Sequence, residues 1–316
     1  MFKYILQRIG AMLLTLFLIM TLSFWIIRLM PASIFENPQV DPEIQRMLEA
    51  ELHLDKPMYV QYWYFLKGVV TEGDFGTSYK IRPGTPVFEL SISRVPITML
   101  MNGFALLIAI PLGIVAGTLS ALRRNKMTDH IISFLIVIFI SVPSFVFASL
   151  LQYLFTFKLG LFPTLYDSQA VTFAEMMHSL CLPIIALALG PTATIGRYLR
   201  GELIENMNSE YLLLARTKGL TKAQTIIRHA FRNSMVPLTN IILPMITGII
   251  GGSLVVENIF AVPGIGGLLV DSIQNSDHFL TIINLLFYSI TSLVSILLVD
   301  ISYGIIDPRI RIGGRK

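Results

Sequence analysis

Six uncharged apolar runs constrain the fold of this chain more than any other feature. They cover residues 9–27, 95–122, 131–157, 179–196, 233–256 and 279–299, and each has at least 18 residues. A helix of about 20 residues crosses a hydrocarbon core roughly 30 Å thick. Only 14% of the residues are charged, against about 25% in soluble domains. The sequence therefore predicts an all-α, polytopic membrane protein with six transmembrane helices.

The first run could instead be a cleaved signal peptide. Lys3 and Arg8 would form its basic region, and residues 30–33, Met-Pro-Ala-Ser, resemble a cleavage site. The apolar region of a signal peptide usually has about 7–15 residues, whereas this run continues without a charge to residue 27. The length favours a retained transmembrane helix.

The distribution of basic residues predicts the orientation. Two thirds of the 24 lysines and arginines lie in the N-terminus, the 123–130 and 197–232 loops and the C-terminal tail. The 257–278 loop has none, and the 158–178 loop has only Lys158. Because cytoplasmic loops carry the excess of basic residues, both termini are expected in the cytoplasm. The net charge of +4 then reflects topology and contact with anionic membrane lipid, and nucleic acid binding is not expected.

These spans divide the chain into four parts. Residues 1–29 are an N-terminal segment with the first transmembrane helix, 30–94 an extracytoplasmic subdomain, 95–305 a core transmembrane domain and 306–316 a cytoplasmic tail. Within 30–94, Asp41 is placed to cap one helix, residues 57–67 form a second amphipathic block, and 73–78 and 82–86 have turn composition. The segment is expected to be a small helical subdomain on the outer face.

Proline and glycine are frequent in the predicted spans. Prolines are tolerated in transmembrane helices because neighbouring groups satisfy the freed carbonyls. The G-x-x-x-G pairs 113/117 and 248/252 predict close helix approach. The spans have no charge in their middles, since Glu257 and Asp300 sit at the ends. Ion-coupled carriers usually place ionisable residues at membrane depth, so this absence argues against such a carrier.

The 36 residues from 197 to 232 form a polar, basic cytoplasmic loop with helical signals. Asn208 or Ser209 can cap a helix that runs to about Thr217, and Gly219 can end it in a left-handed conformation. The sequence T-x-x-Q at 221–224 is a capping box for another helix. We expect two short helices around Gly219, with Leu212, Leu213 and Ala215 forming an apolar knob buried by the spans or by a partner.

Catalytic and cofactor motifs are not found in the sequence. There is no G-x-x-x-x-G-K-[ST] phosphate-binding loop, and the glycines at 264–267 fit a turn. The single cysteine, Cys181, and the nearby His178 are too few ligands for a transition-metal site. We expect neither an enzyme nor a cofactor-binding chain, and a membrane-embedded enzyme would need clustered polar groups that the spans lack.

The polar loop contains the pattern Y-x-x-x-A-R-x-K-G-L followed by H-x-x-R-N-x-x-x-P. With the preceding acid, its residues are Glu210, Tyr211, Ala215, Arg216, Lys218, Gly219, Leu220, His229, Arg232, Asn233 and Pro237. This pattern resembles the coupling loop of ABC importer permeases in the dipeptide/oligopeptide/nickel family. Residues 73–78, 256–267 and 307–311 are similar to other stretches of that family, and the segment after the first span is typical of its first permease subunit. Residues 213–215 are Leu-Leu-Ala where the general pattern has Glu-Ala-Ala, as is common in the peptide branch.

The resemblance implies a type I ABC importer permease fold in a bacterial cell membrane. Its implied partners are a second homologous permease, two cytoplasmic ATPases that use ATP and magnesium, and an extracytoplasmic substrate-binding protein. The 197–232 loop would insert into the ATPase and couple its closure to movement of the spans.

The substrate is left open by the sequence. Relatives carry peptides, nickel and other small solutes; a pathway with few charges favours dipeptides or oligopeptides, with nickel as the alternative. An ion-coupled carrier, with the loop as a membrane anchor, is the competing class.

Overall fold

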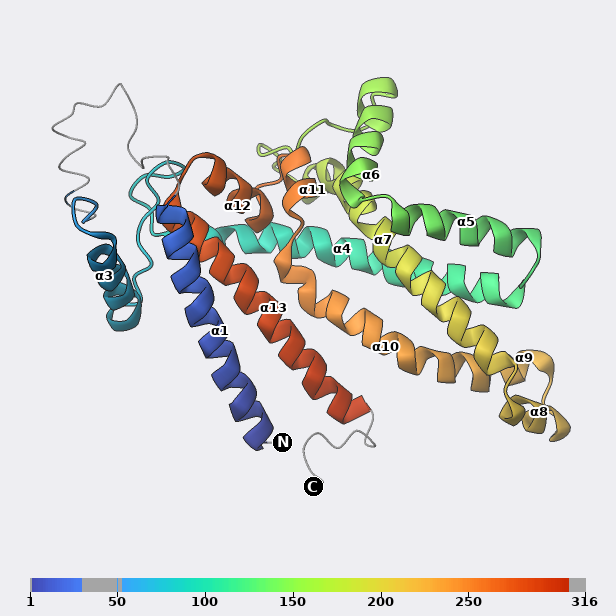
Figure 1. The fold of residues 1–316 in the computed structure, drawn as a ribbon. Helices are drawn as coiled ribbons and strands as arrows, with labels where there is room; N and C mark the ends of the chain where they lie inside the picture. The colour runs from blue at the N-terminus through green and yellow to red at the C-terminus, as the bar shows by residue number, and fades with distance from the viewer. Residues whose placement is uncertain (1, 30–49, 51–52, 307–316) are drawn as a thin grey trace. The chain divides into compact units, whose positions relative to one another are not determined.

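The computed structural model describes residues 2–29, 50 and 53–306, and it divides into two compact units. The first unit comprises the described residues up to Pro96 together with Pro263–Val294, and the second comprises Ile97–Val262 and the described residues from Ser295 onward. The described residues are almost entirely helical (Figure 1). The first unit contains α1 (Phe2–Arg28), α3 (Met58–Thr71) and α12 (Ile265–Gln274). The second contains α5 (Met127–Ser141), α6 (Ser144–Leu151), α7 (Phe173–Met207), α8 (Glu210–Thr217), α9 (Lys222–Thr225), α10 (Arg232–Thr247) and α11 (Leu254–Ile259). Helices α4 (Val87–Leu122) and α13 (His278–Ile306) have residues in both.

The described helices confirm the transmembrane class of the chain. Five helical segments are long and apolar enough to cross a membrane, and a bent pair would make a sixth if it crosses as one span. Each of the six apolar runs falls mainly in helix. The helix predicted after Asp41 and the tail motif at 307–311 lie outside the described residues.

The third predicted span is not a single straight helix. Helix α5 ends at Ser141, and α6 with the π-helical Gln152–Lys158 begins at Ser144, bent by 103° from α5. Proline disfavours helical backbone at the residue before it, and Val142, which precedes Pro143, is extended at φ −93° and ψ 126°. The apolar run predicted as one span over 131–157 is therefore sharply bent at this proline, and the two helices make one span only if they cross the membrane together.

The fifth apolar run also breaks before its predicted end. After α10, a 3-10 turn covers Gly248–Gly251, and Gly252 has φ +62°. A Cβ on Gly252 would lie 2.5 Å from Oε1 of Glu257, so the residue is tied to this turn. A Cβ on Gly252 would also lie 2.9 Å from Cγ2 of Thr98 on α4, so Gly252 does allow a close approach to that helix. Gly248 has open space around its Cβ position. The prediction of close approach therefore holds at Gly252, which lies in a turn, and is wrong at Gly248.

The other glycine pair does bring two helices close. A Cβ on Gly113 of α4 would lie 2.7 Å from Cβ of Ile195, and one on Gly117 would lie 2.7 Å from the carbonyl oxygen of Gly196, both on α7. Any side chain at these positions would displace α7. The prediction of close approach at Gly113 and Gly117 is confirmed.

The first unit builds its core from α1, α3, α12 and the start of α13. Phe24 and Phe65 are buried there with stacked rings 5.2 Å apart, beside the fully buried Leu280. The turns predicted in the outside segment are present, with Gly73 and Gly76 at φ +66° and +91°. These turns lead into the loop that approaches α13.

A buried carboxylate fastens this loop to the start of α13. Oδ2 of Asp277 accepts a hydrogen bond of 2.5 Å from the Ser78 hydroxyl, and the backbone N–H groups of Tyr79, Lys80 and Ile81 also point at it. Three backbone donors and a hydroxyl satisfy Oδ2, a buried oxygen that would be costly to leave without partners. The position of the 73–81 loop in the first unit is fixed in this way.

Candidate functional site

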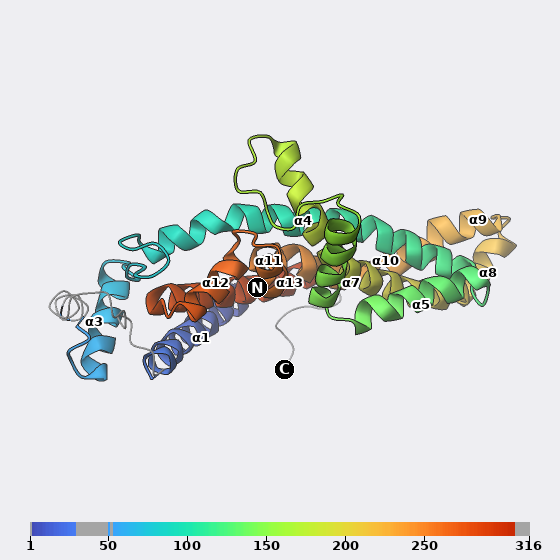
Figure 2. The same ribbon diagram turned by 90° about the horizontal axis from the view of Figure 1, so that it is seen from above.

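Helix α8 lies beyond the end of α7, and the chain then turns back through α9 into α10. Figures 1 and 2 both show α8 and α9 together at this end of α7 and α10. Helix α7 continues to Met207, well past the apolar run that ends at Gly196, so the first part of the predicted 197–232 loop is helical. The pattern residues are thus carried by α8, its C-terminal turn and the start of the following helical segment.

Asn206 joins three helices at this point. Its Oδ1 accepts a 2.6 Å hydrogen bond from the Tyr211 hydroxyl of α8, and its Nδ2 donates to Oγ of Ser234 on α10 at 3.1 Å. Ser209 has the extended backbone of an N-cap, but its hydroxyl donates to the Asn206 carbonyl and caps nothing. The sequence analysis did not single out Asn206, which orients α8 against α7 and α10.

The inner face of α8 is buried in the unit itself. Leu212 and Ala215 are 1% and 8% exposed, in a cluster with Ala121 of α4, Leu203 of α7 and Ala230. Burying a leucine side chain stabilises by roughly 1.5–3 kcal/mol. Leu213, predicted to share this knob, is 65% exposed. The chain itself therefore buries Leu212 and Ala215, and burial of Leu213 by a partner stays a prediction.

The C-terminus of α8 ends in a Schellman motif at Gly219. The Leu220 N–H donates to the Ala215 carbonyl at 3.3 Å, and the Gly219 N–H donates to the Arg216 carbonyl at 2.9 Å. Gly219 has φ +91°, a conformation that glycine adopts without the steric cost other residues meet. The predicted left-handed glycine is confirmed, and it sets the direction in which the chain leaves α8.

The outer face of α8 combines apolar and basic side chains. Leu213 and Leu214 are 65% and 56% exposed, and Tyr211 is partly exposed beside them. Arg216 and Lys218 follow at the C-terminal end, and Glu210 lies at the first residue. Within the part of the chain that the structure describes, neither basic side chain makes a hydrogen bond or ion pair. We define Leu213, Leu214, Arg216 and Lys218 as the α8 outer surface.

The second helix begins with the capping box predicted for Thr221. The Gln224 N–H donates to the Thr221 hydroxyl at 3.3 Å, and the Gln224 side chain accepts from the Thr221 N–H at 3.0 Å. The helix is not short as predicted, because it continues through the π-helical Ile226–Phe231 into α10. The sequence analysis ended the loop at Arg232, its last basic residue, and therefore did not join this helix to the apolar run that follows.

The remaining pattern residues lie along this continuous helix. His229 is half-buried in the π-helical segment, Arg232 and Asn233 are exposed, and Pro237 is half-buried inside α10. In the described residues no hydrogen bond links their side chains to α8. The structure thus packs Tyr211 and Ala215 against α7 and places His229, Arg232, Asn233 and Pro237 along the continuous helix that ends in α10. The remaining pattern residues stay on α8 and its C-terminal turn.

An ion pair that the sequence analysis missed holds the α4–α5 turn to α7. Arg200 donates two hydrogen bonds to the Asp129 carboxylate, from Nε to Oδ1 at 2.7 Å and from Nη2 to Oδ2 at 2.8 Å. The Asp129 carboxylate also accepts from the Ser120 hydroxyl and, at 2.9 Å, from the Asn125 N–H. Asp129 is buried, whereas the Arg200 side chain is 31% exposed. A bidentate pair of this kind fixes the relative orientation of the two side chains. It therefore holds the C-terminal part of α7 against the α4–α5 turn.

Known proteins match this chain over nearly its whole length. The profile of the family described as binding-protein-dependent transport system inner membrane component matches residues 109–312, and its N-terminal component matches residues 1–102. The dipeptide transport system permease protein DppB of Lactococcus lactis subsp. cremoris is 41% identical over 99% of this chain and 100% of its own length. DppB of Bacillus subtilis is 36% identical, with 99% of both chains covered. The oligopeptide transport system permease protein OppB of Escherichia coli K12 is 36% identical over 98% of this chain and all of its own. A solved amino acid ABC transporter chain covers 68% of this chain, and 93% of that chain, at 19% identity with a TM-score of 0.49.

Proposed function

This chain belongs to the binding-protein-dependent transport system inner membrane component family, and from that premise we propose that it is the permease subunit of an ATP-driven peptide importer. The two DppB proteins and OppB, which share 36–41% identity with it over nearly the full chain, are named for dipeptide and oligopeptide transport. It is a multi-pass membrane component. The proposed pathway is formed with a second, related permease and is supplied by an external substrate-binding protein.

The α8 outer surface is the observation that carries this proposal. Its two leucines are more than half exposed on a helix whose other face is already buried in the chain. Exposed apolar side chains rimmed by charged ones are typical of protein interaction sites. A cytoplasmic ATPase subunit, which would bind ATP and magnesium, is the partner we assign to it.

The connections of α8 suit the transmission of movement. Its inner face packs on α4, α7 and Ala230, and Asn206 ties it to α7 and α10. A displacement of α8 by a closing ATPase would therefore be passed to helices long enough to span the membrane. The proposal gives Glu210, Tyr211 and Ala215 the role of holding α8 and gives Gly219 and Leu220 the role of turning the chain. Arg216 and Lys218 contact the ATPase, and His229, Arg232, Asn233 and Pro237 line the return helix.

This arrangement requires α8 to face the cytoplasm, with both termini on the same side. The excess of lysine and arginine in the segments assigned to that side supports this orientation. Exposed ion pairs contribute about 0–1 kcal/mol each, so the two leucines are expected to supply most of the affinity for the ATPase. Arg216 and Lys218 would contribute mainly to orientation.

Uptake by cells tests the proposal. Cells without this chain are compared with cells that express the wild type or Leu213→Asp, and uptake of radiolabelled dialanine and tetraalanine is measured. We expect uptake to need the chain and ATP and to fall sharply in Leu213→Asp. Leu213→Met serves as the matched control and should transport normally. Normal peptide uptake in cells without the chain, or uptake of nickel in place of peptide, would contradict the assignment.

A further inference from the structure

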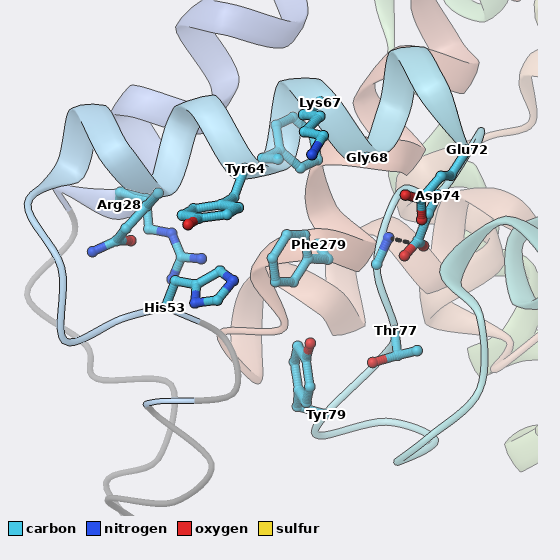
Figure 3. A pocket seen from close by; sticks show the side chains of 13 residues that line it. Arg28, His53, Tyr64, Lys67, Gly68, Glu72, Asp74, Thr77, Tyr79 and Phe279 are labelled. Carbon is cyan, nitrogen blue, oxygen red and sulfur yellow. Dashed lines mark hydrogen bonds between the residues drawn. The ribbon is translucent and has the colours of Figure 1, made fainter.

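Residues of the first unit line a cavity of about 340 Å³, and none of them belongs to the α8 outer surface. It is lined by the end of α1, one face of α3, the turn that follows α3 and the start of α13 (Figure 3). Its volume is near the lower end of the range for small-molecule sites, about 300–1,000 Å³. The cavity can therefore hold a compact ligand.

One end of the cavity presents a cation. The Arg28 guanidinium lies over the rings of Phe24 and Phe279, 5.5 and 5.4 Å from their centroids. Its Nε is buried and has no hydrogen-bond partner among the described residues, and the same is true of Oε1 of Gln61, another lining residue. A buried donor without a partner is uncommon in a folded protein. The planar guanidinium fork matches the geometry of a carboxylate.

The other end presents carboxylates. Figure 3 shows Glu72 and Asp74 together, with Arg28, His53 and Tyr64 at the opposite end. The turn folds back because the N–H groups of Glu72 and Asp74 both donate to the carbonyl of Gly68, at 3.0 and 3.1 Å. These carboxylates suit a ligand ammonium group.

Aromatic rings form the wall between the two ends. Phe279 and Tyr79 lie in the middle of the view in Figure 3, and Phe65 also lines the cavity. Gly76 allows the loop to approach, since a Cβ there would lie 2.9 Å from the Phe279 ring. Apolar walls with a few charged groups at fixed points are typical of ligand sites.

Helix α3 gives an approximate length for one wall of the cavity. Eight residues separate Tyr64 from Glu72, which is a rise of about 12 Å at 1.5 Å per residue. An extended peptide spans about 3.3–3.6 Å per residue. The wall along α3, from Tyr64 at the Arg28 end to Glu72, is therefore about as long as an extended peptide of about three to four residues.

We propose that this cavity binds a short free peptide, with the peptide carboxylate at Arg28 and its ammonium group at Glu72 and Asp74. The choice of a peptide rests on the proposed function, whereas the requirement for two opposite terminal charges rests on the cavity alone. An anionic lipid headgroup would use Arg28 and Lys67 but would be repelled by the two carboxylates. The site would hold a peptide between residues 53–79 and the ends of two candidate spans, at Arg28 and Phe279.

Binding to the purified full-length chain tests the proposal without any variant. The chain is placed in phosphatidylcholine nanodiscs, and calorimetry compares tetraalanine with its N-acetyl, C-amide and doubly blocked forms. We expect each single block to weaken binding roughly tenfold or more, because a hydrogen-bonded charge is lost. Equal binding of the four forms, or no binding of tetraalanine, overturns the proposal. Displacement by inorganic phosphate, with no effect of N-acetylation, would show an anion site and would also overturn it.

Two variants assign the ends of the peptide. Arg28→Gln should bind tetraalanine and its C-amide with equal affinity. Glu72→Gln should reduce the difference in affinity between tetraalanine and its N-acetyl form. Arg82→Gln and Glu89→Gln make the same charge changes at exposed positions outside the cavity lining, and they should keep the full discrimination. Each variant is checked by its thermal unfolding curve, and a folded Arg28→Gln that still prefers the free carboxylate contradicts the assignment.

The two proposals fail in different measurements. If cells with the chain import peptide but the purified chain does not distinguish the blocked forms, the site is wrong and the importer function stands. If import does not require the chain, the importer function is wrong, whatever the binding data show.

Discussion

Replacing Gly219 by alanine tests how the C-terminal turn of α8 directs the chain. A Cβ at this position would meet no atom within 4 Å, so the cost is set by the backbone alone. At φ +91° an L-residue is strained by about 1–2 kcal/mol, and alanine recovers up to about 1 kcal/mol by restricting the unfolded chain. The net destabilisation of the turn is about 1 kcal/mol, which corresponds to about a fivefold increase in its open fraction.

Hydrogen exchange of the Leu220 amide measures this opening, because that amide donates to the Ala215 carbonyl across the turn. We expect about fivefold faster exchange in Gly219→Ala. Gly201→Ala is the matched control, since Gly201 also has open space around it but lies inside α7 at a helical φ. That change should stabilise its helix by up to about 1 kcal/mol. Equal exchange in wild type and Gly219→Ala would refute the strain argument.

Gly219→Val extends the same test to transport. A β-branched residue is a genuine outlier at positive φ, so the cost should exceed that of alanine and the helix after the turn should be redirected. We expect peptide uptake to be abolished while the chain stays in the membrane at its normal amount, as judged by immunoblot. Normal uptake by Gly219→Val would count against a coupling role for this turn.

Three further changes test the contacts around α8. Asp129→Asn should lower the unfolding temperature of the purified chain by an amount equivalent to about 3 kcal/mol, because it leaves Arg200 partly buried without its anion. An unchanged melting curve would show that the pair does not contribute to stability. Tyr211→Phe removes the hydrogen bond to α7 and should destabilise α8 by about 0.5–1.5 kcal/mol, seen as faster amide exchange within α8 only, so unchanged exchange there would argue against the contact. Gly117→Val must push α4 from α7 and should cost about 1–3 kcal/mol in thermal unfolding, whereas Gly10→Val, which has open space, should cost less; similar losses for both would contradict the close packing.

The transmembrane class could be predicted from the sequence because lipid imposes long uncharged runs. The breaks inside those runs were harder to predict, although Pro143 carried the signal for one of them. Proline is tolerated in other spans of this chain, such as Pro183 and Pro191 within α7, so its presence alone does not identify a bend. What differs at Val142 is an extended backbone, which a following proline favours but does not impose in every span.

The local chemistry of the candidate site was predicted better than its tertiary contacts. Gly219 and the Thr221 capping box depend on neighbouring residues, and both are present. The Arg200 and Asp129 pair joins residues 71 positions apart, and a single sequence gives no means to pair them. The division of α8 into a buried Leu212 and an exposed Leu213 follows from how α8 lies on α7, which the sequence does not specify.

Cross-linking from the α8 outer surface tests the central claim most directly. Cys181, the single cysteine, is replaced by serine, and Leu213→Cys or the adjacent Leu212→Cys is introduced for reaction with a maleimide photo-cross-linker in native membranes. Leu213 is 65% exposed and Leu212 is 1% exposed, so the pair differs in access more than in position. The account predicts that Leu213→Cys, but not Leu212→Cys, yields a product in which mass spectrometry identifies an ATPase with a glycine-rich phosphate-binding loop. If Leu213→Cys still imports peptide and gives no ATPase product, the docking role of α8 is contradicted.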